Sequence, residues 1–179
     1  MSIPQHETPT VPIADAIDNA IRKIGNLIAW SYVALVLVII LQVTLRKGFS
    51  SGLIALEELQ WHLYAIGVMF GVSYAQVNNA HVRVDLICNG LRVQTKRIID
   101  IIGILTLALP FIAVIVFHSL DFVADSWRIN ESSSSPSGLP WRWAIKAVIP
   151  ASFALLGFAV VSRLIRNVVL LIREKSSWK

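Results

Sequence analysis

The stretch that decides the fold is IGNLIAWSYVALVLVIILQVTL, residues 24–45. It contains no charged side chain and stands between Arg22-Lys23 and Arg46-Lys47. A helix of this length is about 33 Å long, enough to cross a hydrocarbon core of about 30 Å. The stretch therefore predicts a transmembrane helix.

The composition of the whole chain agrees with a membrane protein. Of its 179 residues, 55% are hydrophobic and 15% are charged, and the mean hydropathy is +0.66. Soluble domains carry about 25% charged residues. We therefore expect the apolar surface to be buried in lipid.

Three further apolar stretches predict membrane-spanning helices at about 53–77, 98–120 and 141–163. Pro110 is expected to kink the third, because proline has no N–H to donate within a helix. The segment 130–140 is rich in serine, proline and glycine and predicts a loop.

The uncharged core of the last stretch, residues 147–162, is too short to span by itself. It spans if Lys146 and Arg163 extend toward the two interfaces. The predicted fold class is thus an all-α integral membrane protein with four transmembrane helices. A short amphipathic segment at 86–98 is expected on the inner leaflet, between the second and third helices.

These spans divide the chain into three parts. Residues 1–20 are predicted to form a flexible cytoplasmic tail, 21–172 a four-helix membrane domain, and 173–179 a second cytoplasmic tail.

The distribution of basic residues predicts that both termini lie in the cytoplasm. With that orientation the outer segments hold five Lys and Arg residues: Arg46, Lys47, Arg128, Arg142 and Lys146. The inner segments hold the other eleven of the sixteen: Arg22, Lys23, Arg83, Arg92, Lys96, Arg97, Arg163, Arg166, Arg173, Lys175 and Lys179. Positive charge concentrates on cytoplasmic loops.

Several function classes find no support in the sequence. The net charge of +5 belongs to residues that flank apolar runs, which favours membrane lipid over nucleic acid as the partner. A single cysteine, Cys88, excludes an internal disulfide. No nucleotide-binding or hydrolase motif is present. We expect no enzyme activity and no cofactor.

Charged residues inside the predicted spans need partners or water. Glu57 and Glu58 lie about one turn inside the second span, and Lys146 lies at a similar depth in the fourth. We predict that Lys146 pairs with Glu57 or Glu58, with Arg46 and Arg142 as further partners. The alternatives are that each side chain reaches the surface by itself, or that the carboxylates relay protons.

Gly67 and Gly71 form a G-x-x-x-G pattern, which favours a close helix contact in lipid. His62 and His118 both fall in the outer half of the predicted bundle, where two axial histidines could hold a haem. The alternative to haem is a pair of hydrogen-bonded polar residues. In the inner loop, His81, Arg83 and Asp85 alternate with apolar residues and predict an ordered turn at the interface; the alternative is a solvated loop.

Three stretches together resemble a known family. They read EELQWHLYAIG at 57–67, HVRVDL at 81–86 and GLPWRWAIK at 138–146, the last followed by Ile149-Pro150. In this order and spacing they resemble the small membrane subunit (DctQ-like) of the tripartite ATP-independent periplasmic, or TRAP, transporters. The resemblance covers about residues 20–172.

The resemblance implies a role in the bacterial inner membrane, beside a large permease subunit and a periplasmic solute-binding protein. It implies sodium-driven uptake of an organic acid, with substrate and ion sites on the large subunit. Candidates for the subunit interface or scaffold are Glu57, Glu58, Trp61, Gly67, Gly71, Arg142 and Lys146. Candidates for docking the binding protein are Trp127, Arg128 and Trp141. The second reading is a haem-binding membrane anchor of a respiratory enzyme.

Overall fold

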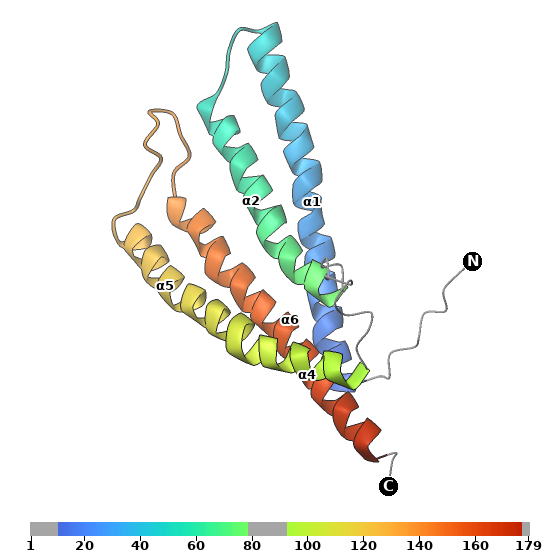
Figure 1. Cartoon of the computed structure of the whole chain (residues 1–179). Helices are drawn as coiled ribbons and strands as arrows, with labels where there is room; N and C mark the ends of the chain where they lie inside the picture. Colours follow the sequence, from blue (N-terminus) through green and yellow to red (C-terminus); the bar gives the residue numbers. More distant parts are fainter. Residues whose placement is uncertain (1–10, 79–92, 177–179) are drawn as a thin grey trace, which may run out of the picture.

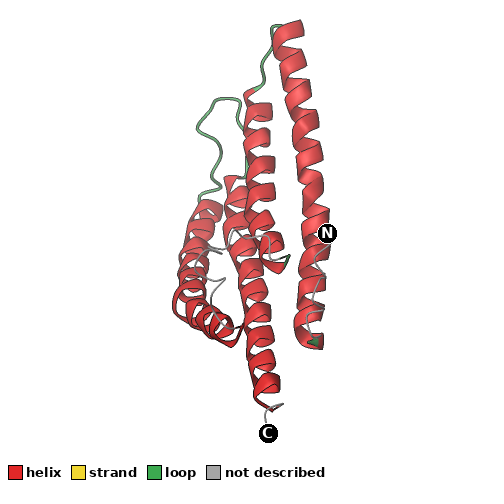
Figure 2. Ribbon diagram, turned by 45° about the vertical axis from the view of Figure 1, so that its right-hand side comes forward, coloured by secondary structure: helices red, strands yellow, loops and turns green. Residues whose placement is uncertain are grey.

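The computed structural model describes residues 11–78 and 93–176, and every regular element within these ranges is helical (Figure 2). The elements are the helices α1 (Pro12–Gly48), α2 (Ile54–Val77), α4 (Val93–Gly103), the π-helical turn η1 (Ile104–Ala108), α5 (Leu109–Arg128) and α6 (Arg142–Ser176).

The four long helices form two hairpins, α1 with α2 and α5 with α6. Helix α2 also packs on α6, so the order across the molecule is α1, α2, α6, α5 (Figure 1). The loops 49–53 and 129–141 lie at one end, called here the loop end. The start of α1 and the end of α6 lie at the other, called the terminal end (Figures 1 and 2).

Three described segments are long and apolar enough to cross a membrane: Pro12–Gly48, Val93–Arg128 and Arg142–Arg173. Helix α2, with 24 residues, does not meet the same apolar requirement. Gln60 and His62 in its first half reduce its apolar character. The chain is therefore a multi-pass membrane protein, and the crossing by α2 stays a prediction.

Helix α1 begins well before its apolar stretch. Pro12 occupies the first turn, where its missing N–H costs nothing, and the Asp15 carboxylate accepts the Val11 N–H at 3.1 Å. The prediction of a loose tail through residue 20 is therefore wrong from Pro12 onward. At about 1.5 Å per residue the helix is about 55 Å long, which exceeds a hydrocarbon core of about 30 Å. Its ends therefore extend beyond the lipid core.

The predicted kink at Pro110 takes the form of a wide helical turn. The π-helical turn η1 ends at Ala108, and the Leu109 N–H reaches the Ile104 carbonyl, five residues back. Such a turn accommodates the N–H that Pro110 lacks. The helix curves through this region (Figure 1). Helix α4 leads directly into it, so the segment predicted at 86–98 belongs, from Val93, to the third long helix. Its first part lies outside the described residues.

Helix α6 is the centre of the packing. Ala159 is buried in one cluster with Ile21 of α1 and Val77 of α2. Its neighbour Val160 is buried in a second cluster, with Ile104 of η1 and Ile112 of α5. Serines, which are small, lie where helices pack closely. For example, the Ser73 hydroxyl of α2 donates to the Ser152 carbonyl of α6 at 3.3 Å. The two hairpins are thus joined along α6.

Candidate functional site

At the loop end, the first candidate carboxylate, Glu57, contacts its own hairpin partner. The Arg46 guanidinium lies 3.6 Å from Glu57 Oε1, and the Gln42 amide donates to the same oxygen at 3.2 Å. Arg46 and Glu57 are both well exposed. This cluster joins the end of α1 to the start of α2.

The second carboxylate, Glu58, contacts the other hairpin. The Ser133 hydroxyl donates to Glu58 Oε1, and the Leu139 N–H donates to Oε2 at 2.7 Å. Gly138 fits here because a Cβ at this position would lie 2.8 Å from Glu58 Oε1 and would collide with Ser133. Glu58 therefore fixes the serine-rich loop on α2.

Lys146 does not pair with either glutamate of α2, so that prediction is wrong about the partner. Its ammonium group binds Glu131 in the loop that precedes α6 and lies 3.9 Å from the centroid of the Phe122 ring. The side chains of Lys146 and Glu131 are only 17% and 24% exposed. The ammonium group holds the pKa of Glu131 below its usual value, and the Arg142 charge adds to this effect.

The docking candidates lie at the same end. The rings of Trp127 and Trp143 meet edge to face with centroids 4.4 Å apart, which joins the end of α5 to the start of α6. Arg128 pairs with Asp125 at 3.0 Å, and both side chains are exposed. Trp141 is 63% exposed and has a φ of 61°. These side chains form an exposed aromatic and charged rim.

The two glycines of the G-x-x-x-G pattern do different things. A Cβ on Gly67 would lie 2.5 Å from Tyr32 Cζ of α1, whereas a Cβ on Gly71 would meet nothing within 4 Å. Gly67 therefore makes a close contact within the chain, and Gly71 faces open space. Trp61, on the same helix, is 70% exposed.

The histidines are not brought together. Helix α6 lies between α2, which carries His62, and α5, which carries His118 (Figure 1). The His118 ring nitrogen is 2.9 Å from the Val114 carbonyl of its own helix. The geometry therefore gives no support to a haem held between them. The inner-loop candidates His81, Arg83 and Asp85 lie outside the described residues.

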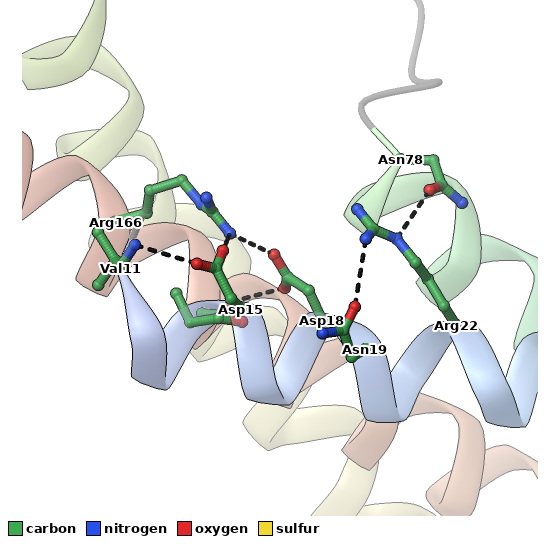
Figure 3. Close-up of polar contacts among 9 residues, drawn as sticks. Val11, Asp15, Asp18, Asn19, Arg22, Asn78 and Arg166 are labelled. Carbon is green, nitrogen blue, oxygen red and sulfur yellow. Dashed lines mark hydrogen bonds and ion pairs between the residues drawn. The ribbon is translucent and has the colours of Figure 1, made fainter. Parts of the chain in front are cut away.

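Sequence reasoning missed a cluster at the terminal end, shown in Figure 3. Arg166 of α6 lies 2.9 Å from Asp15 and 2.6 Å from Asp18, both on α1. The Ser162 hydroxyl contacts Asp18 Oδ1 at 2.6 Å and the Ala14 carbonyl at 3.1 Å. The sequence signal was the spacing of two aspartates at i and i+3 before a helical run.

A second ion pair extends this cluster to the third long helix. Arg163 of α6 lies 2.7 Å from Asp100 of α4. Arg163 thus binds α4, and Arg166, about one turn further along α6, binds α1. The polar contacts tie the three helices together where they leave the apolar layer.

The arrangement offers surfaces for assembly. Within residues 11–78 and 93–176, no group of three His, Cys, Asp or Glu side chains could hold a metal ion. In the most apolar 18-residue stretch of α1, no residue is buried inside the protein. In the corresponding stretches of the third and fourth long helices, 11% and 17% of the residues are buried. The apolar faces are thus free to meet lipid or another protein.

The sequence matches the model of a known protein family. The family model described as "Tripartite ATP-independent periplasmic transporters, DctQ component" matches residues 35–170, which is most of the chain. The match confirms the resemblance predicted from the sequence, and it is to a transporter component rather than to an enzyme family. No curated protein matches the sequence.

Proposed function

Because the chain belongs to the DctQ component family of tripartite ATP-independent periplasmic transporters, we propose that it scaffolds the large permease subunit and helps to dock a periplasmic substrate-binding protein. The proposed complex takes up an organic acid, driven by a sodium gradient across the bacterial inner membrane. Substrate and sodium sites are assigned to the large subunit, and no cofactor is assigned to this chain.

The scaffold role is supported above all by the exposure of the apolar helices. Leu37 of α1 is 62% exposed, Phe117 of α5 is 69% exposed and Phe158 of α6 is 61% exposed. Side chains of this size on several helices provide the area that a large apolar interface requires. Helix α6 and the polar contacts at both ends join the two hairpins into one unit, as a fixed scaffold needs.

The docking role is supported by the rim at the loop end. Trp127 and Trp141 are exposed, and Arg128 carries an exposed charge beside them. Tryptophan and arginine are enriched where proteins bind one another. The contacts of Glu58 with Ser133 and Leu139 order the loop before a partner arrives, which reduces the entropy lost on binding.

The proposed orientation places the loop end in the periplasm. The first and last described helices have their terminal ends on the same side of the molecule (Figure 1). The excess of Lys and Arg assigned to that side supports a cytoplasmic location for both termini. The docking rim then faces the compartment that holds the binding protein.

Site-specific photo-crosslinking in the presence of the large subunit tests the scaffold role. The photoreactive residue p-benzoylphenylalanine, placed singly at the exposed positions Leu37, Phe117 and Phe158, inserts into neighbouring C–H bonds and so reports a protein neighbour inside the membrane. The proposal predicts a crosslink to the co-expressed large subunit from at least one of these three positions. Absence of such a crosslink at all three positions would contradict the proposal.

A further inference from the structure

A cavity of about 300 Å³ lies between α1 and α2 at the loop end. Its lining combines apolar and polar side chains: Ile39, Gln42, Val43 and Arg46 from α1, and Glu57, Gln60 and Trp61 from α2. The cavity therefore suits a ligand that has both an apolar and a charged part.

A buried glutamine in the wall of the cavity positions its acidic group. Gln42 is only 5% exposed, and its Oε1 is closed off from solvent, so this oxygen is not a contact for a ligand. The amide nitrogen donates to Glu57 Oε1 at 3.2 Å. The buried amide therefore holds the Glu57 carboxylate in place at the edge of the cavity.

The cavity also presents two opposite charges. Arg46 and Glu57 are 3.6 Å apart, and their side chains are 69% and 49% exposed. Both the arginine and Gln42 contact Glu57 Oε1, which leaves the second carboxylate oxygen for an ammonium group. The guanidinium has five N–H donors in a fork that fits a phosphate. The charges thus match a zwitterion that carries both an amine and a phosphate.

The position of the cavity identifies the source of such a zwitterion. Ile39 and Val43 belong to the uncharged stretch 24–45, whereas Arg46 and Lys47 follow it directly. The cavity therefore lies where an apolar span gives way to charge, at the depth of lipid headgroups. Trp61 is 70% exposed, and tryptophan favours this interface.

We propose that the cavity between α1 and α2 binds a phospholipid with a primary-amine headgroup, a phosphatidylethanolamine. The ammonium group donates to the Glu57 carboxylate. The phosphate lies on Arg46, and an acyl chain follows Ile39 and Val43 between the helices. This lipid would add to the contacts of Glu57 with Arg46 and Gln42 that join α1 to α2 at the loop end, and the proposal does not depend on the transporter role.

Native mass spectrometry of the full-length chain, purified in detergent and titrated with defined lipids, tests the proposal. Phosphatidylethanolamine should bind more tightly than phosphatidylcholine, whose quaternary amine cannot donate, and than phosphatidylglycerol, which has no amine. Glu57→Gln and Arg46→Gln should each weaken phosphatidylethanolamine binding about tenfold, the scale of one charge-assisted hydrogen bond.

The matched control is Arg128→Gln, which removes an equally exposed charge at the same end but outside the cavity. It should leave lipid binding unchanged. Glycerophosphoethanolamine, which has the headgroup without acyl chains, should not displace the lipid. Equal binding of the three lipids, wild-type affinity in both cavity variants, or full displacement by the soluble headgroup would each overturn the proposal.

Discussion

Tyr32 of α1 packs directly over Gly67 of α2, and a second contact reverses the two roles. Gly25 lies seven residues before Tyr32 in α1, and Tyr74 lies seven residues after Gly67 in the antiparallel α2. There Tyr74 of α2 packs over Gly25 of α1, where a Cβ would collide with the tyrosine ring. The two contacts are two helical turns apart. The α1–α2 hairpin is therefore held by two reciprocal tyrosine–glycine contacts rather than by a glycine stripe on one helix.

This arrangement predicts opposite results for the two glycines of the G-x-x-x-G pattern. Gly67→Ala should lower the free energy of unfolding by about 1–2 kcal/mol, because overpacking outweighs the gain in helix propensity. Gly71→Ala should be neutral or slightly stabilising, since open space surrounds the position. Thermal unfolding of the purified chain in detergent measures the difference. Equal melting temperatures for the two variants would contradict the tyrosine–glycine packing.

The cluster at the terminal end predicts a large effect for one arginine. Arg166→Gln should destabilise the chain by about 2–4 kcal/mol, because it leaves the nearly buried Asp18 without its cation. Arg128→Gln, in an exposed pair, should change stability by less than about 0.5 kcal/mol. Denaturant titration of both variants provides the comparison. A small effect of Arg166→Gln would show that Ser162 alone satisfies Asp18.

The Lys146–Glu131 pair predicts a pH-dependent loop. The lysine lowers the pKa of Glu131 in the folded state, so the pair contributes its full stability above the usual pKa of glutamate. That contribution is lost as the pH falls through the lowered pKa. The protection of residues 129–141 against hydrogen exchange, taken relative to the intrinsic exchange rate at each pH, should therefore fall below about pH 4, near the glutamate reference value. In Glu131→Gln this protection should already be low at pH 7, and the acid-dependent step should be absent.

A charge exchange tests the identity of the partner. Lys146→Glu combined with Glu131→Lys should restore the slow exchange that either single change removes. The same lysine change combined with Glu58→Lys should not restore it, because Glu58 binds Ser133 and Leu139 instead. The opposite pattern of rescue would reinstate the pairing predicted from the sequence.

The close fit of Gly138 against Ser133 and Glu58 predicts that the serine-rich loop has no room for a side chain at this position. Gly138→Ala should displace the loop, since the added methyl group would meet Ser133 and lie 2.8 Å from Glu58 Oε1. Limited proteolysis within 129–141 should become at least several times faster. Gly48→Ala, at a position with nothing within 4 Å, is the control and should cleave at the wild-type rate.

The sequence predicted the helices better than their partners. The uncharged run between Arg22-Lys23 and Arg46-Lys47 located a membrane span, because length and charge are local properties. The choice between Glu131 and the α2 glutamates for Lys146 depends on how two hairpins pack, which no local pattern encodes. From the sequence, the π-helical turn before Pro110 could be predicted only as a kink in the third helix.

The start of α1 shows the same limit. Polar residues and three prolines made residues 1–20 resemble a tail, and only the packing of Asp15 and Asp18 on Arg166 reveals a helix there. Tertiary contacts outweighed local composition. The aspartates were visible in the sequence, but their partner Arg166 lies 151 residues from Asp15 and 148 residues from Asp18, on the last helix.

Solute uptake into proteoliposomes that contain this chain, the large permease subunit and the binding protein tests the scaffold and docking role directly. Radiolabelled organic acids would be supplied with an inward sodium gradient, and each protein would be left out in turn. Uptake should require the gradient and all three proteins. Undiminished uptake by the large subunit and the binding protein without this chain would contradict the scaffold and docking role.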